Sequence, residues 1–197
     1  MFQNENAFKK VLSYSYTDSD IRKYLGEDAK IIEYEELLRY NTLFDLLPQD
    51  KSYVIILIET KDNYGHYVCL CRLGSGATDG RLQYFDSYAK GVDEQQKFID
   101  PWWRRESNQD KKHLTRMIKD CPYKLEYLAR PLQSKYKFDA TCGRWCILFI
   151  LQFLKGMDIK AFLDWLDFMI EQQDLEKYKE FKYDIIVIEQ ISYTPSS

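Results

Sequence analysis

Four side chains in this sequence are of the types that thiolate acyl-transfer chemistry requires. Cys142 directly precedes a long apolar run, His66 and Asp86 lie upstream of it, and the carboxamide of Gln133 stands nine residues before it. A thiolate nucleophile needs a base, a group that orients the base and hydrogen-bond donors for the oxyanion. The set therefore predicts a cysteine protease with Cys142, His66, Asp86 and Gln133 as its candidate catalytic residues.

The position of Cys142 favours a reactive thiol. The residues that follow it are apolar on nearly every side, and only Arg144, Gln152 and Lys155 interrupt them. This pattern predicts a buried helix with one thin polar stripe, and Thr141 is a suitable N-cap. The unpaired N–H groups and the positive dipole end of a helix start favour the thiolate form. The Cys142 N–H itself is also placed to donate to an oxyanion.

His66 and Asp86 are predicted to share one face of a β-hairpin. Strands are expected at 66–73 and 81–86, because turn-forming residues fill the interval 74–80. If Leu73 pairs with Arg81, Asp86 falls opposite Val68 and His66 becomes its diagonal neighbour, about 7–8 Å away between Cα atoms. A slip of one residue would place the two side chains on opposite faces.

The other segments predict a single α+β domain, with a mixed central sheet beside the buried helix that carries Cys142 and further flanking helices. Val-Ile-Ile-Leu-Ile at 54–58 predicts a strand buried on both faces. Strands are also expected at 30–32 and 124–130, and helices at 6–14, 21–25, 34–47 and 160–173; residues 185–191 fit a strand or a helix. The expected parts are a helical N-terminal part (1–50), a sheet with His66 and Asp86 (51–90), a Gln loop and Cys helix (124–156) and a C-terminal helix and tail (157–197).

Composition narrows the class of protein. A net charge of −3 argues against a surface coated in basic residues for nucleic acid. The longest apolar run is shorter than the roughly 18–20 residues that span a bilayer, and the polar start is unlike a secretory signal. Five cysteines without zinc or thioredoxin spacing predict buried free thiols in a reducing compartment. With two histidines no metal site is expected, and His113, after two lysines, is interpreted as a surface residue.

The order His…Asp…Gln…Cys also resembles a known family. The matching segments are Gly65-His66-Tyr67-Val68, Tyr84-Phe85-Asp86-Ser87-Tyr88, Leu132-Gln133-Ser134 and Thr141-Cys142-Gly143-Arg144-Trp145. They resemble the adenovirus-protease-like and SUMO-protease-like cysteine peptidases, and most of all the maturation proteases of virophages and Polinton-type elements. The likeness covers roughly residues 10–155. Two departures are Tyr67, where such proteases often have tryptophan, and a slightly long interval between Gln133 and Cys142.

The resemblance implies roles for the four residues. Cys142 would be the nucleophile, His66 its base and imidazolium partner, Asp86 the orienting acid and Gln133 the oxyanion donor, in an adenain-like fold. The implied substrates are viral capsid or structural precursors, cut near small residues such as glycine during virion maturation, in the virion and the viral factory of the host cytoplasm. No cofactor is required. DNA or a viral peptide activates some such enzymes, and a basic cluster is available for phosphate contacts: Arg104, Arg105, Lys111, Lys112, Arg116 and Lys119.

Two other functions fit the same residues. One keeps the chemistry and changes the substrate to a ubiquitin-like modifier such as SUMO or ubiquitin. The other is a binding protein with a protease-like fold and an inert site, because a buried cysteine, a strand histidine, a turn-opening aspartate and a loop glutamine each have a structural explanation when taken alone.

Overall fold

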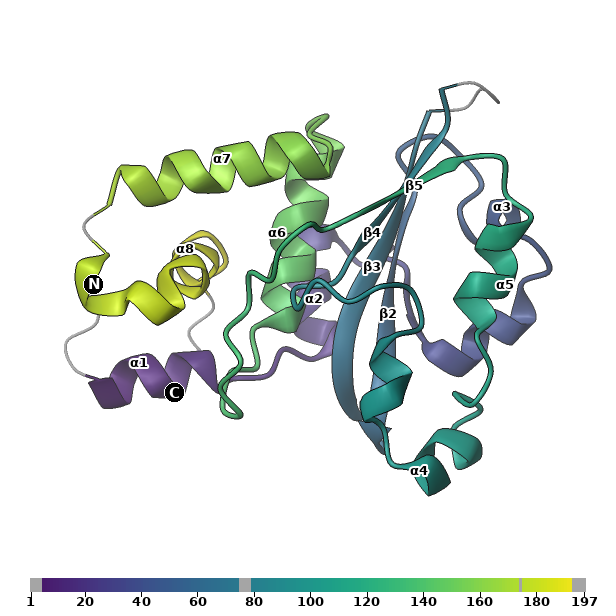
Figure 1. Ribbon diagram of the computed structural model, residues 1–197, viewed down its shortest axis with the longest axis horizontal. Coiled ribbons are helices and arrows are strands. Elements are labelled where there is room, and N and C mark those ends of the chain that lie inside the picture. Colours follow the sequence, from purple (N-terminus) through teal and green to yellow (C-terminus); the bar gives the residue numbers. More distant parts are fainter. Residues whose placement is uncertain (1–4, 75–78, 174, 193–197) are drawn as a thin grey trace.

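A five-stranded mixed sheet forms the centre of the molecule, seen in a computed structural model that describes residues 5–74, 79–173 and 175–192 (Figure 1). The strands lie in chain order, with β2, β3 and β4 antiparallel and the edge strands β1 and β5 parallel to their neighbours. The strands are β1 (Ile31–Glu33), β2 (Tyr53–Lys61), β3 (Tyr64–Leu73), β4 (Arg81–Phe85) and β5 (Lys124–Tyr127).

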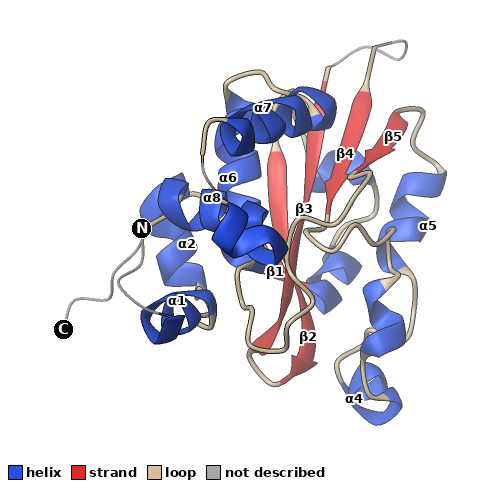
Figure 2. Cartoon of the chain, turned by 60° about the vertical axis from the view of Figure 1, so that its left-hand side comes forward, coloured by secondary structure: helices blue, strands red, loops and turns tan. Residues whose placement is uncertain are grey.

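Helices cover both faces of this sheet. In Figures 1 and 2, α1, α2, α6, α7 and α8 lie on one side and α3, α4 and α5 on the other. The α-helices are α1 (Glu5–Leu12), α2 (Asp18–Leu25), α3 (Leu43–Leu46), α4 (Pro101–Glu106), α5 (His113–Lys119), α6 (Cys142–Leu154), α7 (Ile159–Glu171) and α8 (Lys182–Gln190). The 3-10 helices are η1 (Tyr34–Arg39), η2 (Gln95–Phe98) and η3 (Glu176–Phe181). The predicted α+β domain with a mixed sheet is confirmed, and none of the helices described is long and apolar enough to cross a bilayer.

The two helical layers explain the uninterrupted apolar run of β2. Alternate side chains of a strand point to opposite faces. Ile55 and Leu57 therefore join the core with α6, whereas Val54, Ile56 and Ile58 join a second core beneath η1, α3 and α5. A strand buried on both faces has no position left for a polar side chain, as the sequence predicted.

The hairpin of β3 and β4 has the predicted register. Leu73 pairs with Arg81 and Cys69 with Phe85, which sets Asp86 directly after the last pair. Part of the predicted turn, residues 75–78, lies outside the described residues. At the start of β3, Gly65 is required by close packing, because a Cβ there would lie 2.0 Å from the carbonyl oxygen of Ile58. The residue before His66 can therefore carry no side chain.

Several predicted elements differ from those observed. The helix expected at 34–47 is two pieces, η1 and α3, because Thr42 and Asp45 form a capping box that starts a new helix. The strand expected at 124–130 ends at Tyr127. Of the two alternatives for 185–191, the helix is confirmed, because these residues fall largely within α8. Between α7 and α8 the structure also has η3, which was not expected.

Helix α6 is the central helix of its layer. The predicted polar stripe is largely buried rather than solvated: Arg144 is 1% exposed and Gln152 8%. The Arg144 guanidinium donates to the carbonyl oxygen of Val11 at 2.8 Å and lies 4.6 Å from the centre of the Tyr16 ring. On a helix at the surface such an arginine would face water. Here the Arg144 side chain is buried and joins α6 to α1 through this hydrogen bond.

Candidate active site

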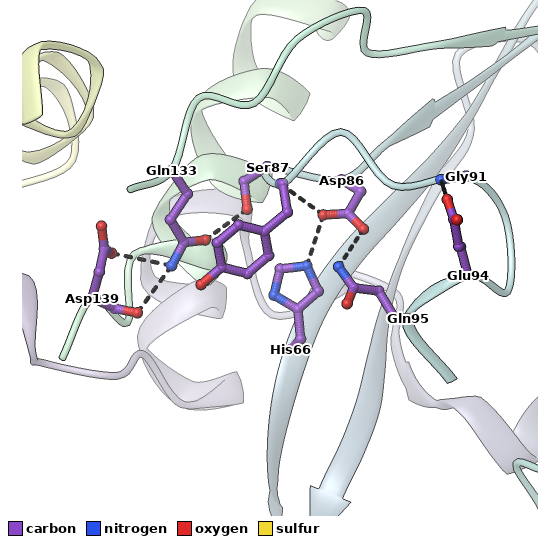
Figure 3. Close-up of polar contacts among 9 residues, drawn as sticks. His66, Asp86, Ser87, Gly91, Glu94, Gln95, Gln133 and Asp139 are labelled. Carbon is purple, nitrogen blue, oxygen red and sulfur yellow. Dashed lines mark hydrogen bonds and ion pairs between the residues drawn. The ribbon is translucent and has the colours of Figure 1, made fainter. Parts of the chain in front are cut away.

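The ends of the central strands and the start of α6 meet at one cleft of about 1070 Å³. His66 near the start of β3, Gln133 from the loop after β5 and Cys142 at the first position of α6 all line it. Asp86 lies behind His66, at the end of β4 (Figure 3). The fold thus brings together all four candidate residues, which are up to 76 positions apart in the sequence.

Asp86 holds the imidazole of His66. Its Oδ1 lies 2.9 Å from His66 Nε2 and accepts the backbone N–H of Tyr88 at 2.8 Å, while its Oδ2 accepts the Gln95 amide at 2.7 Å. Asp86 is 1% exposed, so these protein groups replace water around the carboxylate. The bond to Nε2 leaves Nδ1 for the thiol of Cys142. The predicted contact between His66 and Asp86 is confirmed.

The surroundings of His66 favour its charged form. Burial alone would lower its pKa, but the Asp86 carboxylate and hydrogen bonding to Asp86 and to the Cys142 thiol raise the pKa of His66 to about 10. An imidazolium is therefore available at neutral pH to pair with a thiolate. The ring of Tyr88 stacks on the imidazole, with centroids 4.9 Å apart and an interplanar angle of 28°, and restricts its rotation.

Cys142 begins α6, so its N–H has no intrahelical acceptor. The side chain is 6% exposed and borders the cleft. Thr141 holds the N-cap position, but its hydroxyl makes no capping bond and donates instead to Asp139 Oδ1 at 2.7 Å. The expected capping bond is therefore not formed: Thr141 has φ −83° and ψ 1°, outside the extended conformation of a capping residue, and its hydroxyl is directed at Asp139. All five cysteines are free thiols, as predicted.

Gln133 is fixed by contacts on both ends of its amide. Its Oε1 accepts the Ser87 hydroxyl at 2.7 Å, and its Nε2 donates to the backbone oxygen and to Oδ1 of Asp139, at 3.0 and 3.1 Å. The backbone N–H of Gln133 also donates to the carbonyl oxygen of Ser87. The Gln133 loop is thereby tied to the segment that carries Asp86, and its amide nitrogen points toward Asp139 (Figure 3).

Sequence reasoning missed the residues that support the four. Ser87 and Tyr88 adjoin Asp86, and Asp139 stands three residues before Cys142, so their nearness to the site was visible. Gln95 lies on η2, in a polar stretch whose pattern gave no signal for a role. It is the amide of Gln95 that occupies the second oxygen of Asp86.

Two interpretations from the sequence change. Tyr67, which stands where similar proteases often have tryptophan, donates from its hydroxyl to Asp18 and packs over Gly143, while Tyr88 stacks on His66. His113 is 4% exposed, and its Nε2 lies 3.1 Å from the carbonyl oxygen of Asn108, so it is a core residue and not a surface one. Helix α5 buries it because His113 packs against the ring of Tyr34.

Fold and site together define an α+β domain with a buried His–Asp pair beside a helix-borne cysteine. No family model matches the chain. It is 35% identical over 150 residues to a protein of Sputnik virophage described as uncharacterized protein V9, and the alignment spans 76% of this chain and 82% of V9. The chain therefore belongs to the family of virophage proteins that includes V9.

Proposed function

We propose that this protein is a cysteine endopeptidase that cleaves capsid or other structural precursor proteins during virion maturation. One observation carries the proposal: a buried carboxylate holds an imidazole that lines the same cleft as a cysteine at the start of a buried helix. The kinship with a virophage protein supports the viral setting. The resemblance of the four motifs to maturation proteases supports the class of substrate.

The first half-reaction uses the Cys142–His66 pair. The Cys142 thiolate attacks the carbonyl carbon of the scissile peptide bond, and a carbon–sulfur bond forms as the carbonyl electron pair moves onto oxygen. The His66 imidazolium then gives its Nδ1 proton to the leaving nitrogen as the C–N bond breaks. Asp86 keeps the ring oriented throughout, because the bond to Nε2 fixes its position.

The oxyanion is stabilised by the Cys142 N–H and by the Gln133 amide. Gln133 Nε2 donates to two oxygens of Asp139, and we propose that one N–H is shared between them, so that the second N–H donates to the oxyanion. Each such donor contributes about 10²–10³-fold to kcat in acyl-transfer enzymes. In the second half-reaction, neutral His66 takes a proton from a water molecule whose oxygen attacks the thioester; the C–S bond breaks, the acid is released, and the thiolate–imidazolium pair is restored.

The test is cleavage of the capsid precursor encoded by the same genome. Wild-type protein should convert the precursor to a shorter product, and Cys142→Ala should not. Cys146→Ala is the matched control, because Cys146 lies one turn further along α6, is buried, and has no role in the proposed chemistry. Cleavage that persists in Cys142→Ala would show that the nucleophile is wrong.

Two further measurements separate the other functions. Rapid labelling of Cys142 by ubiquitin or SUMO vinyl-sulfone probes would assign the enzyme to modifier processing instead. Alkylation by iodoacetamide near pH 6 tests an inert site, since an ordinary thiol, with its pKa near 8.5, reacts slowly there. A Cys142 no faster than such a thiol would contradict the enzymatic proposal.

A further inference from the structure

Two buried carboxyl groups meet beneath the loop that precedes Cys142. Asp139 belongs to this loop and is 7% exposed, while Asp184 comes from α8 and is 1% exposed. Asp184 Oδ2 accepts the backbone N–H of Ser134 at 3.1 Å, and its Oδ1 lies 3.1 Å from the hydroxyl of Thr141 and 3.4 Å from the indole nitrogen of Trp145. Ser134 follows Gln133 and Thr141 precedes Cys142, so Asp184 contacts both ends of the segment between the two.

Two carboxyl oxygens compete for one hydroxyl proton in this cluster. The Thr141 hydroxyl has a single proton and faces Oδ1 of Asp139 at 2.7 Å and Oδ1 of Asp184 at 3.1 Å. The shorter distance favours donation to Asp139, whose Oδ2 accepts the hydroxyl of Ser134. A proton on Asp184, donated to the Thr141 oxygen, makes the longer contact a full hydrogen bond and removes the repulsion between two buried carboxylates.

We propose that Asp184 is a positioning residue of the active site, a carboxylic acid that donates to Thr141 and accepts from Ser134, and so fixes the Gln133 amide relative to the Cys142 thiol. This inference rests on the proposed function. It gives the C-terminal helix α8, which lies outside the family resemblance, a defined part in catalysis. Asp184 reaches neither the thiol nor the imidazole, so it acts through Ser134 and Thr141.

The electrostatic surroundings agree with a neutral Asp184. Burial, followed by the neighbouring Asp139 carboxylate, raises the pKa of Asp184 well above its usual range. From the loop after β4, Tyr88 lies within electrostatic range of both carboxyl groups. Among the described charged groups on elements packed against α8, Asp167 of α7 contacts Arg130 and Tyr183, and Arg144 of α6 binds Val11. Lys9 and Lys10 of α1 and Lys179 and Glu180 of η3 are exposed.

Loss of Asp184 should slow turnover rather than weaken substrate binding. Asp184→Ala leaves the Ser134 N–H without its acceptor and frees the segment up to Thr141, so kcat for a fluorogenic peptide should fall about 10²-fold, as for a lost oxyanion donor, with KM nearly unchanged. Asp184→Asn should keep kcat much closer to wild type than Asp184→Ala, because its amide can donate to Thr141 and accept from Ser134, and it gives up only the long 3.4 Å contact with the Trp145 indole. An Asp184→Asn variant as slow as Asp184→Ala would overturn the inference.

A second measurement does not depend on catalysis. A native carboxyl group that keeps its proton while the unfolded chain loses it makes the unfolding equilibrium constant rise about tenfold per pH unit above the ordinary pKa of Asp. Wild type should therefore lose stability relative to Asp184→Asn between pH 5 and 8, measured by urea unfolding. Asp164→Asn, at an exposed position of α7, is the control and should show no such trend.

The outcomes separate this inference from the proposed function. A flat stability difference between wild type and Asp184→Asn over that range would show an ionised Asp184 and refute the inference, even in an active protease. If the stability difference between wild type and Asp184→Asn changes steeply with pH but the protein cleaves no precursor, the protonated Asp184 is confirmed and the protease function is rejected. The same unfolding measurement, applied to Asp184→Ala, shows whether a lower kcat reflects loss of the fold.

Discussion

Replacing Asp86 by asparagine tests whether the negative charge of the Asp86 carboxylate keeps His66 in its charged form. The new amide keeps the shape of the carboxyl group: its oxygen can accept from His66 and from the Tyr88 N–H, as Asp86 Oδ1 does. Its nitrogen would then face the amide nitrogen of Gln95, which resolves the conflict by rotating its own amide. Only the negative charge is lost.

The size of the effect follows from the raised pKa of His66. A rise from 6.5 to about 10 corresponds to roughly 5 kcal/mol between the two protonation states. Without the Asp86 charge, burial favours the neutral ring, and the pKa of His66 should fall to 6.5 or below. The imidazolium is then scarce at pH 7.5, and kcat/KM should drop roughly 10²–10⁴-fold, the range of general acid–base catalysis.

The direct assay is an NMR titration of His66 in a Cys142→Ala background, with and without Asp86→Asn. The protein has two histidines, and the signals of the buried His113 serve as the assignment reference for those of His66. The free energy of unfolding should depend on pH in the way that the raised pKa of His66 requires. A raised histidine pKa stabilises the fold fully below about pH 6.5, and this contribution is lost as the pH rises through about 10. Equal His66 titration curves in the two proteins would refute the reasoning.

Three other substitutions test the surroundings of the site. Gln95→Leu leaves Asp86 Oδ2 buried without a donor and should lower kcat/KM by about tenfold, in line with an unsatisfied buried acceptor costing about 1–3 kcal/mol; unchanged activity would show that Gln95 is dispensable. Gly65→Ala forces a Cβ to within 2.0 Å of the Ile58 oxygen and should lower the free energy of unfolding by about 3 kcal/mol or more in urea; a wild-type midpoint would contradict the packing. Arg144→Ala removes the bond to Val11 and the contact with Tyr16, and should cost about 2–3 kcal/mol in the same assay while an exposed Lys155→Ala costs almost nothing.

Local patterns were sufficient to predict the elements that carry the site. The β-branched run at 54–58, the turn residues at 74–80 and the apolar run after Cys142 each specify one element through nearby residues alone. The register of β3 and β4, which the sequence analysis took as a condition, is the one observed, and it places His66 beside Asp86. The helix predicted at 34–47 failed because a capping box within it starts a separate helix.

The sequence by itself determined which residues are able to do the chemistry, because a thiol, an imidazole, a carboxylate and a carboxamide at element ends can be recognised without coordinates. Only the tertiary structure decided what holds them. Gln95 reaches Asp86 from η2, Ser87 binds Gln133, and Asp184 comes from α8, 42 positions after Cys142. These contacts join segments distant in the chain, and they depend on burial, which removes water as the competing partner of each polar group. The periodicity and residue spacing of a sequence do not identify such partners, because any buried donor at the right distance can satisfy the same carboxylate.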